Sequence, residues 1–290
     1  MFTRLDPSWL TCPPPPDGPA VRLRYLGTAG FVITGAARTM VIDPFITRPG
    51  LLATGLRRLV PDTAALAAAV PVADDVLIGH AHHDHVLDAP ALCQQTGARF
   101  IGSPSACNVA RAAGLGDEQI VCTQGREFIS CGPTATVYGA PSRHGRVYFG
   151  RVTLPGMISK PPPWPPRVWD LRHGRVLNWH INIDGVQIVH IDSADFDAEE
   201  LAPLRADILC LCAIGRRYRP GYVRDVVRLL QPRYVLACHW DWFFTPYHAT
   251  TRLLPGVDLP GFIDEIHAAG AEAVLLPFDG EVALASGGGA

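Results

Sequence analysis

The chain has 290 residues, of which 48% are hydrophobic and 18% are charged, and its formal net charge is −2. This composition is typical of a globular protein with a sizeable core. The nearly balanced charge gives no basic footprint of the kind that binds nucleic acid or an anionic membrane surface. We therefore expect a small-molecule substrate and no nucleic-acid partner, and we leave a homo-oligomer open.

No segment has the apolar character of a signal peptide or of a membrane span. Residues 1–6 contain no apolar run, and no run of about 18 apolar residues occurs later in the chain. The eight cysteines form no CxxC pair and no disulfide-framework spacing, so buried free thiols are expected. These features predict a cytoplasmic protein without a membrane span.

The first half of the chain reads as strands, followed by alternating strands and helices. Residues 1–20 are rich in proline and predict an irregular arm outside the core. A loop is expected at 45–61. Apolar alternation and short apolar runs predict strands at 21–26, 31–34, 39–42, 75–79, 99–101, 119–122, 126–130 and 134–139. Helices are expected at 62–70, 89–96 and 103–113.

The second half opens with an irregular segment and then returns to strands and helices. Residues 151–178 are rich in Pro, Trp and Arg and predict an insertion, either functional or an ordered surface flap. Strands are expected at 178–183, 186–191, 207–212, 234–238 and 272–276, and helices at 197–203, 222–230 and 259–268. We therefore expect one domain over 21–283, with the arm before it and the insertion at 151–178 within it.

The stretch His80-Ala81-His82-His83-Asp84-His85 follows the predicted strand at 75–79. Imidazole and carboxylate groups are preferred ligands of zinc and of similar divalent ions. Helical ligand pairs recur at i and i+3 or i+4, whereas His80 and His82 are two residues apart, so an extended or looped backbone is expected. A surface loop rich in histidine is the structural alternative. The pattern favours a loop that wraps more than one metal ion.

Three further candidate ligands stand at the ends of later predicted strands. His144 follows the strand at 134–139, Asp192 the strand at 186–191, and His239 the strand at 234–238. A lone histidine at a strand end is more often structural than a metal ligand. Loops at the carboxyl ends of core strands, however, are where rigid scaffolds carry chemistry. We therefore expect these side chains to meet the histidine-rich stretch.

With these residues in this order, the sequence resembles the metallo-β-lactamase superfamily over residues 21–280. The resemblance implies an α+β fold, a four-layer αβ/βα sandwich of two mixed sheets with outer helices and a dinuclear site at one edge. Within the superfamily, the chain looks similar to the group of ascorbate-6-phosphate lactonase (UlaG-like) and N-acylphosphatidylethanolamine phospholipase D. The cues are the segment 25–31, Ile42-Asp43-Pro44 and Cys238-His239-Trp240.

The sequence also departs from the family pattern. Gly79 stands where Ser or Thr usually precedes the motif, and Asp192 lies in Ile-Asp-Ser where Gly-Asp-Thr is usual. Asp88 follows the last motif histidine by three residues, where a carboxylate often follows by two. The ligands are retained, so these differences concern the residues that orient them.

The resemblance implies that His80, His82 and His144 hold one metal ion. It implies a second ion on Asp84, His85 and His239, with Asp192 bridging the two. Zinc is the expected metal, with manganese or iron as alternatives. The remaining histidines, His83 included, are expected in supporting or structural roles.

The expected function is hydrolysis of an ester, lactone, amide or phosphodiester bond by a dinuclear-metal-activated hydroxide. Asp84 is the candidate for orienting the nucleophile and moving its proton. A di-iron redox enzyme on the same fold is the first alternative, although the resemblance then implies a carboxylate in place of His82 and a flavin partner domain. A non-catalytic metal-binding protein is the second.

Candidate substrate contacts come from the residue before His144, from the insertion and from the aromatic segment after His239. They are Arg143, Trp164, Trp242 and His248. The aromatic residues suggest a substrate with an apolar or aromatic portion, and Arg143, Arg146 or Arg167 could meet an anionic group.

Overall fold

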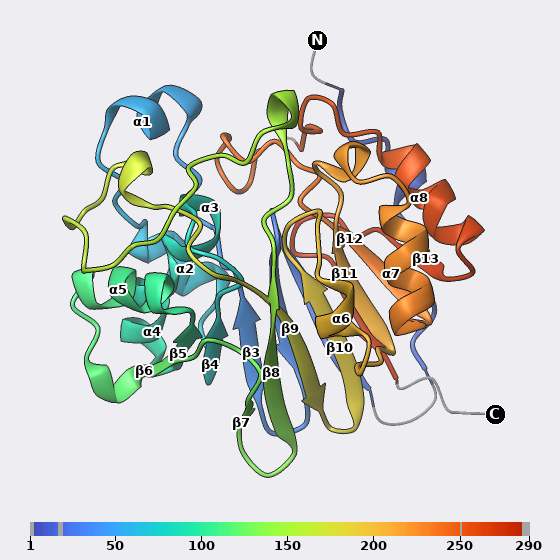
Figure 1. Ribbon diagram of the computed structural model, residues 1–290, viewed down its shortest axis with the longest axis horizontal. Helices are drawn as coiled ribbons and strands as arrows, with labels where there is room; N and C mark the ends of the chain where they lie inside the picture. The colour runs from blue at the N-terminus through green and yellow to red at the C-terminus, as the bar shows by residue number, and fades with distance from the viewer. Residues whose placement is uncertain (1–2, 17–19, 250, 286–290) are drawn as a thin grey trace.

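A computed structural model describes residues 3–16, 20–249 and 251–285. Two seven-stranded sheets pack face to face, with helices on both outer sides (Figure 1). This is the four-layer sandwich that the sequence predicts. Among the described residues, no helix has the length and apolar character that a membrane span requires.

The first sheet is mixed, with β14 to β3 antiparallel and β3 to β6 parallel. Its strands, in spatial order, are β14 (Glu281–Leu284), β1 (Val21–Gly27), β2 (Gly30–Thr34), β3 (Thr39–Ile42), β4 (Asp75–Leu77), β5 (Arg99–Gly102) and β6 (Ile120–Cys122). The parallel strands require crossovers, which the helices on this side supply. These helices are α1 (Leu51–Leu56), α2 (Thr63–Ala69), α3 (His83–Val86), α4 (Ala89–Thr96) and α5 (Pro104–Ala112).

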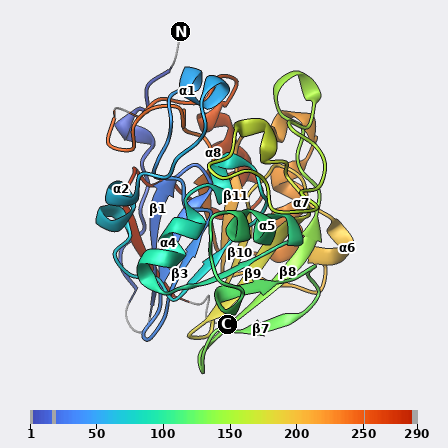
Figure 2. The ribbon, with the colours of Figure 1, turned by 90° about the vertical axis from the view of Figure 1, so that its left-hand side faces the viewer.

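The second sheet repeats this plan, with β7 to β10 antiparallel and β10 to β13 parallel. Its strands, in spatial order, are β13 (Glu272–Val274), β12 (Tyr234–Cys238), β11 (Ile208–Cys212), β10 (Val186–Ile191), β9 (Val176–Ile183), β8 (Ala135–Ser142) and β7 (Phe128–Ser130). The helices α6 (Ala198–Leu201), α7 (Tyr222–Leu230) and α8 (Leu259–Ala268) lie on its outer side (Figures 1 and 2).

The apolar core lies between the sheets and continues under α7 and α8. Every residue of β11 and of β12 is buried, as expected for parallel strands that are covered on both faces. Trp179 on β9 is fully buried and belongs to the same cluster as Tyr25 on β1. A second cluster fills the space under α2, α4 and α5. The two clusters hold the strand ends of both sheets in fixed positions.

Four local predictions from the sequence need correction. The loop predicted at 45–61 contains α1, which buries only Thr54 and therefore has no apolar face to reveal it. Residues 83–86 form a helical turn, not a loop, because the His82 carbonyl accepts the backbone N–H of His85 and of Val86.

The other two corrections concern strand ends. β8 runs on to Ser142, because β9 pairs with it over residues 135–142. β7 pairs only with residues 136–138, so Pro141, which has no N–H to donate, lies where the other edge of β8 is open. β14 was not predicted, since it is four residues long with only two buried side chains, Val282 and Leu284.

The proline-rich arm is irregular apart from a short 3₁₀ turn at Pro7–Trp9, yet it packs on the domain. Leu5, Trp9 and Leu10 are partly buried against the main core. Thr11 and Leu275 exchange two backbone hydrogen bonds of 3.1 Å. The described part of the arm is therefore attached along the edge of the second sheet.

The insertion predicted at 151–178 ends at residue 175, because β9 begins at Val176, and it is also tied to the domain. The Leu59 N–H donates to the Pro166 carbonyl at 2.7 Å, and Arg58 donates to the Pro165 carbonyl at 2.7 Å. On its other side, the Ile158 N–H donates to Ser105 Oγ at 3.0 Å. These bonds place the insertion over α1 and α5, above the end of the first sheet.

A buried ion pair joins three loops at the same end of the sandwich. Arg48 and Asp241 are each at most 2% exposed and form a direct pair. Asp241 Oδ1 also accepts hydrogen bonds from the Tyr25 hydroxyl at 2.9 Å and from the Thr28 N–H at 2.7 Å. The pair fixes the β1–β2 turn against the segment that carries His239.

Arg48→Ala leaves the Asp241 carboxylate buried without its cation. We expect the free energy of unfolding to fall by about 3–5 kcal/mol, the usual result of breaking a buried pair. The control is Arg22→Ala, which removes the exposed Arg22–Glu281 pair and should cost about 1 kcal/mol or less. Urea denaturation of both variants measures the difference, and equal losses would show that the buried pair has no special role.

Candidate metal centre

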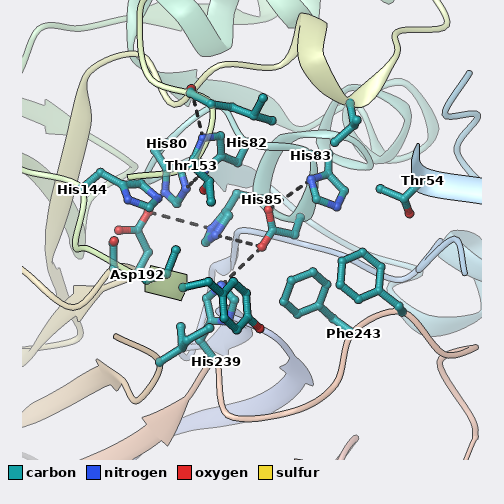
Figure 3. Close-up of a pocket in the computed structure, with 18 of the residues that line it drawn as sticks. Thr54, His80, His82, His83, His85, His144, Thr153, Asp192, His239 and Phe243 are labelled. Carbon is teal, nitrogen blue, oxygen red and sulfur yellow. Dashed lines mark hydrogen bonds and ion pairs between the residues drawn. The ribbon is translucent and has the colours of Figure 1, made fainter. Parts of the chain in front are cut away.

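Seven predicted ligands meet at one edge of the sandwich (Figure 3). His80 and His82 follow β4, and Asp84 and His85 lie in the helical turn α3. The remaining three come from the second sheet: His144 follows β8, Asp192 follows β10 and His239 follows β12. The structure thus brings together residues that are up to 159 positions apart in the sequence, as their places after predicted strands suggested.

The first group consists of His80, His82 and His144, whose ligand atoms lie within 4.8 Å of one another. His80 Nε2 is 2.9 Å from His82 Nδ1. His144 is held by a 2.7 Å contact between its Nδ1 and the Gly145 carbonyl, which leaves its Nε2 for another partner. Three imidazoles that face one another without a carboxylate between them form a cup that suits a divalent cation.

The second group consists of Asp84, His85 and His239. Asp84 Oδ2 lies 3.3 Å from His239 Nε2 and 3.7 Å from His85 Nε2. Two ring nitrogens therefore approach the same carboxylate oxygen. This group is a mixed nitrogen and oxygen donor set. It adjoins the first group, since the rings of His80 and His85 are 3.9 Å apart.

Asp192 lies between the two groups. Its Oδ2 is 2.6 Å from His80 Nδ1 and 3.9 Å from His85 Nδ1. Its Oδ1 is buried and has no hydrogen-bond partner among the described residues, and the same holds for His239 Nδ1. Buried polar atoms without a partner are rare in folded proteins, so these atoms are candidates for contact with an ion or its water.

Asp43 orients His85, a role that the sequence analysis did not assign to it. Its Oδ2 is 2.9 Å from His85 Nδ1, and its Oδ1 accepts the Gly79 N–H at 2.8 Å. Asp43 is fully buried and has a φ of 43°, which is unusual for a residue with a side chain. The contact turns His85 Nε2 towards Asp84. The Asp-Pro pair at the end of β3 was the available signal.

The glycine at position 79 is explained by Asp192. A Cβ built on Gly79 would overlap Asp192 Oδ2 and would lie 2.7 Å from Asp192 Cγ. A serine or threonine at this position would therefore displace the carboxylate. This chain has space for Asp192 in its observed place only because residue 79 has no side chain.

Asp88 is structural. It is fully buried, and its Oδ2 accepts the backbone N–H of Ile46 at 2.6 Å and of Thr47 at 2.8 Å. Burial raises its pKa to about 6. Asp88 therefore ties the loop after β3 to the residues after α3, which hold Asp84 and His85.

Burial determines the protonation of the cluster. It lowers the pKa of His80 and of His82 well below the ordinary value, and it lowers the pKa of His144 to about 4. His85 is also buried, but the carboxylates of Asp43 and Asp84 raise its pKa to about 9. Burial opposes ionisation of Asp84, yet the histidines around it hold its pKa well below the ordinary value. Three neutral imidazoles beside an ionised carboxylate are ready to bind a cation.

A cavity of about 320 Å³ opens beside these donors. Besides the seven donors, its lining comes from α1, α3, the insertion and the residues at the ends of β8, β10, β11 and β12. These lining residues are Leu51, Thr54, Gly55, His83, Val147, Tyr148, Thr153, Leu154, Val168, Ser193, Cys212, Ile214, Phe243 and Phe244. The insertion and the aromatic segment thus reach the cavity, whereas the contributions of α1 and of Tyr148 were not foreseen.

Of the described residues that line this cavity, none is one of the four predicted substrate contacts. Arg143 is exposed and pairs with Asp197 at 3.3 Å. Trp164 and Trp242 pack against the second core cluster, and the ring of His248 lies 5.0 Å from that of Tyr247. Their roles as substrate contacts stay predictions, which the lining does not support.

Gly79→Ala tests the position of Asp192. The added methyl group displaces the carboxylate, so we expect the affinity for zinc to fall by about 10–100-fold, as when residues that orient ligands are changed. Gly55→Ala is the matched control, since a Cβ at that position meets nothing within 4 Å. Zinc titration against a competing chelator measures both variants. Equal affinities for the two would contradict the role of Gly79.

Acid should destabilise the metal-free protein through His144. The unfolded chain takes up a proton near the ordinary pKa of about 6.5, whereas the folded pKa is about 4, so stability falls as the pH drops through this window. For His144 the loss is about 2 kcal/mol between pH 7 and pH 5. Asp43 and Asp88, whose folded pKa values are about 6, act in the opposite direction.

The comparison of wild type with His144→Asn, both treated with chelator, isolates this histidine. Urea denaturation at pH 7 and pH 5 should show a loss on acidification that is about 2 kcal/mol smaller in the variant. The same loss in both proteins would mean that His144 is not kept neutral by burial.

Comparison with known proteins places this site in a family. The profile of the β-lactamase superfamily domain matches residues 22–239. A metal-dependent hydrolase of Thermococcus onnurineus is 29% identical over 229 residues, which cover 76% of this chain and 85% of the relative.

Two solved structures share the fold. A metallo hydrolase from Ignicoccus hospitalis has a TM-score of 0.62 at 19% identity, covering 92% of this chain and 99% of its own. A diiron β-hydroxylase from Streptomyces venezuelae has a TM-score of 0.59 at 15% identity, covering 94% of this chain and 55% of its own.

The narrower resemblance to the UlaG-like group stays a prediction. This protein belongs to the metallo-β-lactamase superfamily and is, like its sequence relatives, a metal-dependent hydrolase.

Proposed function

We propose that this protein hydrolyses an ester, lactone, amide or phosphodiester bond with two divalent metal ions, zinc first and manganese or iron as alternatives. The observation that carries the proposal is the position of Asp192 between two groups of ligand atoms, with one buried oxygen left without a partner. The donor set fits the ions, because the imidazoles of the first group are neutral and Asp84 is ionised. His85, whose pKa is about 9, would release the proton on its Nε2 when the second ion binds.

The ligands follow from the two groups. His80, His82 and His144 would hold one ion, and Asp84, His85 and His239 would hold the other. Asp192 would bridge them. Asp43 supports this arrangement, because its contact with His85 Nδ1 fixes the ring and directs Nε2 to the site.

When bound, two such ions lower the pKa of a shared water towards neutrality and polarise the bond under attack. The chain's own contribution is the Asp84 carboxylate, which lies at the centre of the second group and is ionised. It is placed to orient the attacking water and to accept its proton. The water oxygen bonds to the carbonyl carbon or phosphorus, the bond to the leaving oxygen or nitrogen breaks, and the proton passes to the leaving group.

The di-iron redox alternative is supported only by a shared fold with the diiron β-hydroxylase. The family resemblance implies a carboxylate at position 82 for such a site, whereas this chain has a histidine there, in contact with His80. A non-catalytic metal-binding protein would not need the cavity beside the donors. Hydrolysis of a small molecule, in the cytoplasm and without a nucleic-acid partner, therefore fits best.

Asp84→Asn should separate catalysis from folding. We expect kcat for p-nitrophenyl butyrate to fall by about 100–10,000-fold, the usual contribution of a proton-transfer group. The control is Asp264→Asn on the exposed side of α8. Metal content, measured in parallel, tells whether the loss arises from proton transfer or from a lost ion. A decrease of less than about tenfold would contradict a catalytic role for Asp84.

A further inference from the structure

The cavity beside the donors offers an apolar surface to a substrate. Apart from the donors, half of the residues that line it are aliphatic residues or phenylalanines, among them Leu51, Leu154, Val168, Ile214, Phe243 and Phe244. None of the described residues that line it is an arginine or a lysine. Proteins bind phosphate and carboxylate groups with such cations, so an anionic group away from the metal ions would find no counter-charge here.

Two of the hydrophobic wall residues are also exposed to solvent. Leu51 is 54% exposed and Tyr148 is 38% exposed, although both line the cavity. Apolar surface at the rim of a cavity is covered when an apolar ligand enters. The volume of about 320 Å³ is at the lower end of the range of about 300–1,000 Å³ for small-molecule sites. The substituent that it accepts is therefore small.

His83 is a polar residue with a largely aromatic environment in this part of the cavity. Its ring lies among aromatic rings, 5.7 Å from that of Phe45, 6.2 Å from that of Phe243 and 6.3 Å from that of Phe244. Figure 3 shows it on the side of the cluster that faces Thr54 and Phe243, away from His144 and Asp192.

The two ring nitrogens of His83 differ in their surroundings. Nδ1 lies 3.5 Å from Asp84 Oδ1, whereas Nε2 is buried without a hydrogen-bond partner among the described residues. The Thr54 hydroxyl is directed to the carbonyls of Pro49 and Gly50. His83 Nε2 is therefore left for a group that enters the cavity.

We propose that the cavity selects an uncharged, apolar acyl compound that makes one hydrogen bond to His83 Nε2. This inference rests on the proposed hydrolytic function, because the bond that reacts lies at the donor cluster. Moving a charged group into a wall without cations is costly, whereas burying apolar surface is favourable. Of the four bond types, esters, lactones and amides with a neutral substituent fit the cavity. Compounds with a separate phosphate or carboxylate do not.

Hydroxamic acids test the selectivity without relying on turnover, since their common head group binds the metal ions. Hexanohydroxamic acid and adipic monohydroxamic acid share a chain length, but only the second ends in a carboxylate. Calorimetry on the zinc-loaded protein should give a Kd at least about tenfold lower for the uncharged ligand. Equal affinities, or tighter binding of the charged one, would overturn the proposal.

A second set of ligands tests His83. ω-Hydroxy hydroxamic acids with four, five and six carbons are compared with the unsubstituted acids of the same length. In the wild type, at least one hydroxyl should leave the affinity equal or higher. His83→Phe keeps a ring but loses the nitrogen. In this variant, the affinity for the hydroxylated acid relative to the unsubstituted acid should fall by about fivefold or more. His83→Gln should restore part of it. An unchanged ratio in His83→Phe would rule out the hydrogen bond.

Hydrolysis assays under the same conditions, with p-nitrophenyl hexanoate and with a lactone, an amide and a phosphodiester of similar size, distinguish the two proposals. If the hydroxamic acids bind in the expected order and no ester, lactone, amide or phosphodiester is cleaved, the proposed function fails and the selectivity remains. If the ester is cleaved and the charged and uncharged ligands bind equally, the selectivity fails and the function remains.

Discussion

The crowding of seven His and Asp side chains at the edge of an apolar sandwich, six of them buried and His144 partly buried, is the constraint on which the rest of the structure depends. Imidazole and carboxylate groups lose their water when they are buried, and they are stable there only if something replaces it. Within the cluster, they partly serve one another: His80 meets Asp192, and His239 meets Asp84. Asp192 Oδ1 and His239 Nδ1 are left over. Cations at this edge would complete the set.

A layer of buried residues behind the donors holds them in place. Asp43 fixes His85, Asp88 fixes the loop after β3, and the Arg48–Asp241 pair fixes the turns around His239. Each of these groups is charged or strongly polar, and each is nearly inaccessible to solvent. Their value lies in position, since a donor that shifts by a fraction of an ångström loses much of its affinity for a metal ion. Gly79 contributes by the absence of a side chain.

The sequence allowed the fold and the clustering of the candidate metal ligands to be predicted because both leave local signals. Apolar periodicity identified nearly all strands, and the HxHxDH stretch with His144, Asp192 and His239 at strand ends marked the site. The misses have physical causes. Helix α1 leaves Leu51, Leu52 and Leu56 exposed, so its sequence has no apolar face from which a helix could be predicted. Strand β14 is short, and its partner β1 lies at the opposite end of the chain.

The substrate contacts were the least predictable part. Trp164 and Trp242 have the residue type of a binding site, yet they pack against the core, while Leu51, Tyr148 and Phe244 line the cavity. Whether a loop side chain points into a cavity depends on tertiary packing, which a local sequence pattern does not predict. The same holds for His83, whose role follows from an unpartnered nitrogen among aromatic rings.

The most direct test of the dinuclear centre is anomalous X-ray diffraction at the zinc edge on crystals of the zinc-loaded protein. The account predicts two peaks per chain, one among His80, His82 and His144 and the other among Asp84, His85 and His239, with Asp192 between them. A single peak, or none at this edge of the sandwich, would contradict it.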